Sequence, residues 1–244
     1  MNLPRQVASW LSDGSHWKGS DGVPAQLATH LELSGMAVGI ALAVALPIGL
    51  WLGHVGRGGA LAINISNVGR AIPTYALLVI LFVAISATHR NLETVIALVA
   101  FAIPPILTNT YVGLREVDPE AREAARGMGM NGGQLLRKVE VPLAMPLIMD
   151  GVRIAVVQVI ATTTVAALIG VGGLGRFVTD GFISNDPGEY GAGAVLVAAL
   201  ALTFEGFFAV LQRRVDPARR AGRRGGRVRA APAEQTPVAA LPAG

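Results

Sequence analysis

The chain has 244 residues, of which 52% are hydrophobic and only 15% are charged, with a net charge of +4. Water-soluble domains carry about 25% charged residues, and several apolar runs here approach or exceed the roughly 20 residues that cross a bilayer as a helix. This composition excludes an ordinary water-soluble globule and predicts an all-α polytopic membrane protein, while the absence of cysteine excludes disulfides and thiolate metal sites.

Residues 1–30 are expected to form an N-terminal arm outside the bilayer, and they lack the apolar core of a secretory signal peptide. Trp10 and Trp17 suit either a membrane interface or a loosely ordered polar arm, and both interpretations stay open. The histidines are scattered singly, without the spacing of metal ligands, so no metal site is predicted. They are His16, His30, His54 and His89.

Five apolar segments predict a transmembrane domain over residues 31–211. The segments cover residues 34–53, 72–87, 92–112, 143–169 and 192–211. The second helix has a possible earlier start near Ala60, and Pro104 and Pro105 predict a kink in the third. Residues 212–244 form an Arg-rich tail without apolar periodicity, which is expected to be disordered.

The distribution of positive charge predicts the orientation. Of the 20 lysines and arginines, 15 fall in segments on one face of this five-span arrangement and four on the other. Since positive residues concentrate in cytoplasmic loops, the N-terminus is predicted outside and the tail and the loop 114–142 in the cytoplasm. Topology accounts for the basic tail without a nucleic-acid partner, and anionic membrane lipid is its expected neighbour.

The loop 114–142 predicts a helical hairpin. Asp118, Pro119 and Glu120 form a helix start, with an N-cap, a proline in the first turn and an acid near the helix N-terminus. The next residues place small apolar side chains on one helical face, and glycines end the helix. The face consists of Ala121, Ala124, Ala125 and Met128, and the glycines are Gly127 and Gly129.

The second arm of the hairpin is expected to begin at Asn131 as N-cap and to end at Pro142, with an apolar side between them. That side consists of Leu135, Leu136 and Val139. The alanine face of the first arm would let another protein approach closely. The alternative is a loop that packs under its own helical bundle, and the residues alone leave both open.

The spacing within this hairpin resembles a known pattern. Glu123-Ala124-Ala125, three residues, Gly129, nine residues and then "VEVP" is similar to the EAA signature of ABC importer permeases, with valine at the two positions of isoleucine and leucine. The resemblance implies a type I importer bundle of five transmembrane helices whose hairpin is a coupling helix that seats in a cytoplasmic ATPase. The residues that it assigns to coupling are Glu123, Ala124, Ala125, Gly129, Asn131 and Pro142.

Further stretches narrow the resemblance. "GHVGRG", "GRAIPTYALL", "REVDPEAREAARGMGM" and "ATTTVAALIGVGGLGRFVTDGF" look like the permeases for glycine betaine, choline and carnitine, over roughly residues 31–210. This implies a permease of a bacterial inner membrane that imports an osmoprotectant. Related methionine permeases share the architecture, so an importer of another small solute is the alternative. A channel or a membrane enzyme is the alternative of a different class, although no convergent set of acid, base and nucleophile is apparent.

The expected cofactors and partners are inferred from the motifs that the chain lacks and from its resemblance to importer permeases. No Gly-Lys-Ser/Thr motif occurs, and the two G-x-G-x-x-G matches, at Gly127 and Gly170, lie outside any strand–turn–helix unit. No cofactor is therefore expected in this chain, and ATP and Mg²⁺ are assigned to a partner ATPase. Since only 5% of residues are aromatic, no cage for a quaternary ammonium stands out, so selection is assigned to an extracytoplasmic solute-binding protein. A second permease copy or a paralogous permease is expected to complete the path.

Polar residues inside the predicted spans are candidates for the solute path. Gln158 and Thr162 share a helical face, and Thr108 and Asn109 are weaker candidates; hydrogen bonding between helices is the competing interpretation. Arg153 and Glu205 lie at equal depth, about 10 Å from the same membrane face, which predicts an intramembrane ion pair. Asp150 is the competing local partner for the arginine, and snorkelling to the interface is the third possibility.

Overall fold

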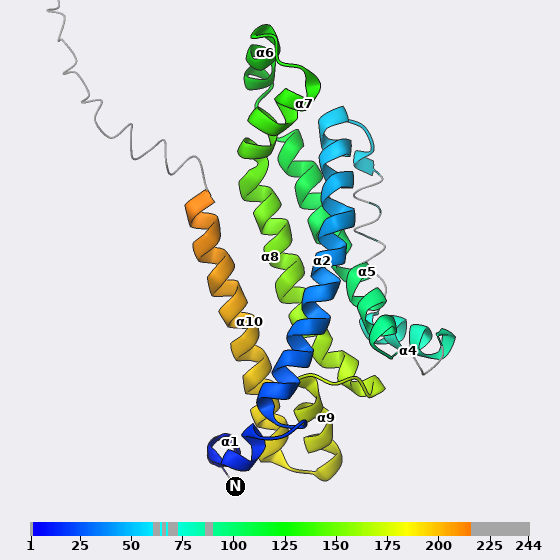
Figure 1. Ribbon diagram of the computed structural model, residues 1–244, viewed down its shortest axis with the longest axis vertical. Coiled ribbons are helices and arrows are strands. Elements are labelled where there is room, and N and C mark those ends of the chain that lie inside the picture. Colours follow the sequence, from blue (N-terminus) through cyan, green and yellow to red (C-terminus); the bar gives the residue numbers. More distant parts are fainter. Residues whose placement is uncertain (1, 61–63, 65–66, 68–72, 86–89, 216–244) are drawn as a thin grey trace, which may run out of the picture.

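The computed structural model describes residues 2–60, 64, 67, 73–85 and 90–215, and every regular element in these ranges is a helix. The long helices run side by side (Figure 1). The helices α6 (Pro119–Gly127) and α7 (Gly132–Leu135) lie at one end, which we call the hairpin end. The helices α1 (Leu3–Ser12) and α9 (Gly175–Ser184) lie at the opposite end.

Within the described ranges, four helices are long and apolar enough to cross a membrane. They are Val23–Val55, Asn91–Arg115, Gly132–Ile169 and Pro187–Arg214. The second expected span, residues 72–87, corresponds to α4 (Thr74–Ala84), whose 11 residues extend about 16 Å, roughly half of a 30 Å hydrocarbon core. Ile85 is extended and ends α4, whereas Ile72, residues 86–87 and most of the stretch after Ala60 lie outside the described residues.

The first helix begins earlier than expected. Helix α2 (Val23–Val55) starts eleven residues before the predicted boundary at residue 34, with Pro24 in its first turn, and ends at Gly56 in the left-handed conformation (φ 72°). Gln26 and His30 lie in its first turns and lower the mean hydropathy of this segment, although both side chains are buried inside the bundle. Hydropathy therefore placed the start of the span too late.

The N-terminal arm is a folded part of the structure rather than a loose polar segment. After α1, the 3₁₀ helix η1 (Gly14–Trp17) brings His16 back onto the ring of Trp10, with stacked centroids 4.1 Å apart. Trp10 is buried and also meets Phe177 of α9 edge-on at 5.2 Å, whereas Trp17 is exposed. An aromatic contact of this kind buries a large apolar area, so Trp10 holds the arm against the end of the bundle that contains α9.

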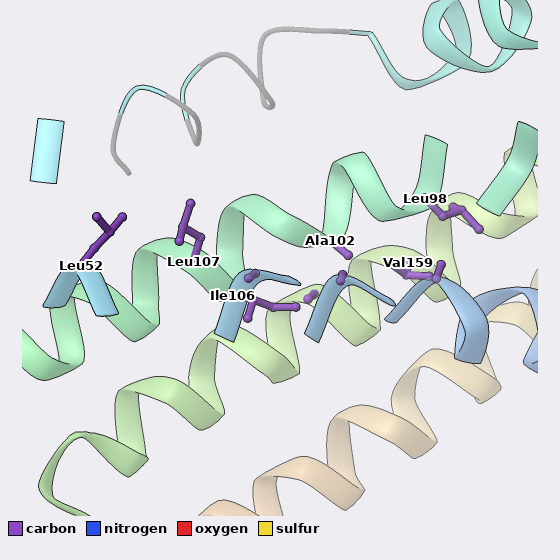
Figure 2. Close-up of a cluster of buried hydrophobic side chains, with 10 residues drawn as sticks. Leu52, Leu98, Ala102, Ile106, Leu107 and Val159 are labelled. Carbon is purple, nitrogen blue, oxygen red and sulfur yellow. The ribbon is translucent and has the colours of Figure 1, made fainter. Parts of the chain in front are cut away.

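The core lies where α2, α5 (Arg90–Arg115) and α8 (Val141–Ala166) pack together. Figure 2 shows this cluster spread along the three helices, from Leu52 of α2 at one end, past Ile106 of α5, to Val159 of α8 and Leu98 of α5 at the other. Small residues let α2 and α5 approach closely, since a Cβ added to Gly49 would lie 2.8 Å from Thr110 Cβ. Such close contact of small residues is typical of helices that pack within membranes.

The remaining helices complete the bundle around this core. The 3₁₀ helix η4 (Ala167–Ile169) ends α8 and leads to α9, and α10 (Pro187–Val215) then runs back along α9, α8 and α1. Figure 1 shows α10 at the edge of the bundle, inclined away from α8 toward the hairpin end. An apolar crevice of about 140 Å³ separates α10 from α2 and α8, and Phe204 and Phe208 line its α10 side.

Candidate functional site

The first arm of the hairpin is α6, and both of its ends are capped by local contacts. Asp118 accepts a hydrogen bond from the Glu120 backbone N–H at 2.9 Å. At the other end Gly129 adopts φ +81°, and the N–H groups of Gly129 and Met130 donate to the carbonyls of Arg126 and Ala125. This is a Schellman cap, which requires a left-handed residue at Gly129, so the glycine is needed for its backbone rather than for space.

The hairpin presents part of α6 to its surroundings. Ala125 is buried against the bundle, whereas Glu123, Ala124 and Gly127 are exposed. Met128, which was expected on the alanine face, is among the most exposed apolar side chains. The exposed surface of α6 therefore combines small residues with the charged side chains of Glu120, Glu123 and Arg126, and the flexible apolar side chain of Met128 follows at its end, which suits contact with another protein.

The second arm begins as expected but does not end at Pro142. Asn131 Oδ1 accepts from the Gln134 N–H at 2.9 Å, and Gln134 Oε1 accepts from the Asn131 N–H at 3.0 Å, which forms a capping box for α7. The chain then continues through the π-helical segment η3 (Leu136–Glu140) directly into α8. The prediction that Pro142 ends this arm is wrong, because the wider turn hydrogen-bonds the Val141 N–H to the Leu136 carbonyl and Pro142 falls in the first turn of α8.

A buried carboxylate ties the hairpin to the bundle. The side chain of Glu140 is 1% exposed; its Oε2 lies 2.5 Å from Nδ1 of His54 on α2, and its Oε1 lies 3.3 Å from Nε of Arg122 on α6. Arg122 also donates from its NH2 group to the carbonyl of Leu114 at the end of α5. We call His54, Arg122 and Glu140 the hairpin clamp.

The hairpin clamp was not predicted from the sequence. Glu140 occupies the variable position of "VEVP", and His54 lies 86 residues away in "GHVGRG". One feature of the sequence could have indicated it. Glu140 follows Leu136 by four residues and so lies on the apolar side of the second arm, where a buried charge needs a partner.

The candidate path residues lie at two depths. Asn109 packs against α8, since a Cβ added to Gly151 would lie 2.7 Å from Asn109 Cβ, and its amide donates to the Pro105 carbonyl of its own helix at 2.8 Å. Thr108 is its half-buried neighbour. Gln158 and Thr162, also half-buried, lie roughly 10 Å or more further along α8 than Gly151. The four residues therefore form two pairs and not one cluster.

Arg153 and Glu205 lie in contact between α8 and α10. Arg153 Nε donates to Glu205 Oε2 at 2.8 Å, and its NH2 group donates to Oε1. The competing acid Asp150 instead accepts from the Gln212 amide at 2.7 Å, and Gln212 Oε1 lies 3.3 Å from NH1 of Arg153. The arginine is therefore satisfied within the protein at this depth.

A second polar group, which was not predicted from the sequence, lies along the N-terminal half of α2. Gln26 Oε1 accepts from the Gly173 N–H at 2.8 Å, and His30 Nε2 lies 3.0 Å from the Ile160 carbonyl oxygen. Ser34 Oγ lies 3.0 Å from Thr163 Oγ1. The spacing of four residues between these α2 side chains was the available signal for a polar stripe that faces α8.

In the described part of the chain, no three histidine, aspartate or glutamate side chains gather in a way that could hold a metal ion.

Comparisons with known proteins agree with this architecture. Residues 45–221 match the family model described as "Binding-protein-dependent transport system inner membrane component". The glycine betaine/carnitine/choline transport system permease protein OpuCB of Bacillus subtilis is 35% identical over 188 residues, which is 77% of this chain and 86% of that protein. The carnitine transport permease protein OpuCB of Listeria monocytogenes is 38% identical over 200 residues, or 81% of this chain and 90% of that protein.

The fold is also similar to that of a solved transporter. A chain of the inward-facing MetNI methionine ABC transporter superposes with a TM-score of 0.67 at 23% sequence identity, covering 80% of this chain and 96% of that one. The family match covers most of the chain, and the relatives align over most of their own length. This chain therefore belongs to the family of inner membrane components of binding-protein-dependent transport systems.

Proposed function

We propose that this chain is the permease subunit of an ATP-driven importer for quaternary-ammonium osmoprotectants such as glycine betaine, choline or carnitine. The observation that carries the proposal is the identity of 34–38% to three permeases named for these solutes, each aligned over at least 86% of its own length. The similarity to the methionine transporter, at 23% identity, supports the fold and not a methionine substrate.

The hairpin is the proposed site of contact with a cytoplasmic ATPase, which would bind ATP and Mg²⁺. Its exposed α6 surface includes Glu123, Ala124 and Gly127, and its two arms are fixed by the caps at Gly129 and Asn131. Pro142 then sets the start of α8. A capped, rigid and exposed hairpin at one end of a bundle is suited to transmit the movement of a partner.

The solute path is proposed to form between this bundle and a second permease, either another copy or a paralogue. Gln158, Thr162, Thr108 and Asn109 are its proposed polar lining, at the two depths described above. An extracytoplasmic solute-binding protein would deliver the solute to the end formed by α1 and α9. ATPase closure would draw the two hairpins together and open the path outward, and hydrolysis would reset it.

The experiment measures uptake in proteoliposomes that contain the whole transporter, with ATP inside and the binding protein outside. We expect uptake of labelled choline that needs ATP and that an excess of glycine betaine or carnitine reduces. Omission of the permease chain is the control for leakage. Uptake of labelled methionine, with no competition by the quaternary amines, would contradict the proposed substrate class but not the importer assignment.

A further inference from the structure

Glu140 is an acidic side chain in the buried interior, where a charge without a partner is unfavourable. Its side chain is 1% exposed, and both oxygens face cationic or proton-donating groups, His54 on Oε2 and Arg122 on Oε1. Burying a carboxylate requires partners that compensate for the lost water, and removing one partner is strongly destabilising. The side chain therefore links its own segment, η3, to two separate helices.

These links reach the helices of the core. His54 is in the last turn of α2, and Arg122 of α6 also contacts the Leu114 carbonyl on α5. Leu114 in turn packs against α2, because a Cβ added to Gly53 would lie 2.7 Å from Leu114 Cβ. The hairpin thus contacts α2 through Glu140 and α5 through Arg122, the residue that Glu140 faces, in addition to its direct continuation into α8.

We infer that Glu140 is a positioning residue for energy coupling: it holds the hairpin against α2 and α5, so that movement of the hairpin displaces the three core helices together. This inference rests on the proposed docking of an ATPase on the hairpin. Without the clamp, the second arm is joined to the bundle through η3, and π-helical turns are places where helices deform. A push on α6 would then bend η3 instead of moving α2 and α5.

The first test uses the complete transporter in proteoliposomes and measures both solute import and ATP hydrolysis. Glu140→Gln keeps the shape of the side chain and removes its charge. We expect hydrolysis to continue while the solute imported per ATP falls by roughly fivefold or more, the lower end of typical coupling between sites. The matched control is Glu116→Gln, which removes an exposed carboxylate beside the hairpin and should leave this ratio unchanged.

The second test needs no ATPase and so separates the clamp from the proposed docking. The chain has no cysteine, so spin labels can be placed at Arg57→Cys after α2 and Arg126→Cys on α6, both exposed positions. In the full-length permease we expect a narrow distribution of distances between the labels, which Glu140→Gln broadens and Glu116→Gln does not. His54→Gln, which leaves the contact between Glu140 and Arg122, serves if Glu140→Gln fails to fold, and should also broaden it.

An unchanged distance distribution in both Glu140→Gln and His54→Gln would overturn the inference, as would an unchanged ratio of import to hydrolysis in Glu140→Gln. Failure of the unsubstituted permease to bind an ATPase would instead count against the proposed function, and the distance measurement would still decide the role of the clamp.

Discussion

Arg153 and Glu205 join α8 to α10 in the half of the bundle nearer the hairpin, with Nε of the arginine 2.8 Å from Oε2 of the glutamate. Gln212 extends this contact, since it lies 3.3 Å from Arg153 through its oxygen and donates to Asp150 through its nitrogen. Figure 1 shows α10 at the edge of the bundle, and these polar contacts attach it to α8 at this depth.

The first prediction is that Arg153→Ala and Glu205→Ala are not additive. Each single change leaves one charge without its partner among apolar residues, which costs up to about 2.5–3.5 kcal/mol at the bilayer centre and less toward its edge. The double change leaves neither charge, so we expect it to lose about 0.5–3 kcal/mol less than the sum of the singles. Folded yield and unfolding midpoints in detergent measure this. The exposed pair Arg176 and Asp21 is the control, and its changes should add.

The second prediction concerns the backbone at Gly129. Space around it is open, so Gly129→Ala and Gly129→Asn test its positive φ, whereas Gly129→Asp also adds a negative charge to the hairpin surface. We expect Gly129→Asp and Gly129→Ala to weaken the Schellman cap by about 1 kcal/mol and to abolish or strongly reduce co-purification of the ATPase subunit, while membrane insertion is unchanged. Gly129→Asn should keep more binding, because asparagine tolerates this conformation.

Gly39→Ala on α2 is the control for Gly129, because Gly39 also has open space, has no positive φ and lies outside the hairpin. Binding of the ATPase should be unaffected by this change. If the subunit still co-purifies at full yield with Gly129→Asp, the docking role of the hairpin is wrong.

The third prediction is the orientation, which rests on the unequal distribution of lysine and arginine. A reporter fused after Gln212 should be cytoplasmic, and one inserted near Asp186, in the turn between α9 and α10, should be external. Compartment-specific activity of the reporters measures this. The reverse pattern would place the hairpin outside and would remove its access to an ATPase.

The fourth prediction concerns the close approach of α2 and α5. An added Cβ would lie 2.8 Å from Thr110 Cβ at Gly49 and 2.7 Å from Leu114 Cβ at Gly53, so alanine at either position should destabilise the fold by about 1–3 kcal/mol. The control is Gly39→Ala on the same helix, where nothing lies within 4 Å. Thermal unfolding in detergent should show a lower midpoint for Gly49→Ala and Gly53→Ala, and an unchanged or higher one for the control.

The parts of the hairpin that depend on local chemistry could be predicted. Asp118 and Pro119 start α6, and Asn131 caps α7, because capping involves residues only two or three positions apart. Pro142 was misassigned, since the π-helical turn before it depends on how η3 packs against the bundle. The start of α2 was placed too late for a related reason: Gln26 and His30 look like loop residues until their partners, Gly173 and Ile160, are known.

A contact between residues far apart in the sequence could be predicted only where the depth of both residues could be calculated from the rise per residue. The rise per residue from a shared membrane face put Arg153 and Glu205 at equal depth, and the two are in contact. The depths of Glu140 and His54 could not be compared in this way. The two residues are 86 positions apart, and hydropathy does not define the lengths of the segments and turns between them. The buried end of an ion pair is therefore visible in a sequence only as a charge in an apolar pattern.

The continuous helix from Gly132 to Ile169 has a mechanical consequence. Gly151 lies at its midpoint and rests directly on α5, where a Cβ would come within 2.7 Å of both the Pro105 carbonyl oxygen and Asn109 Cβ. If this helix tilts as one body about that contact, with the hairpin clamp holding η3 in place, its hairpin end and its Ile169 end move in opposite directions. Such a tilt would open one end of the bundle while it closes the other, without any change in the length of the helix.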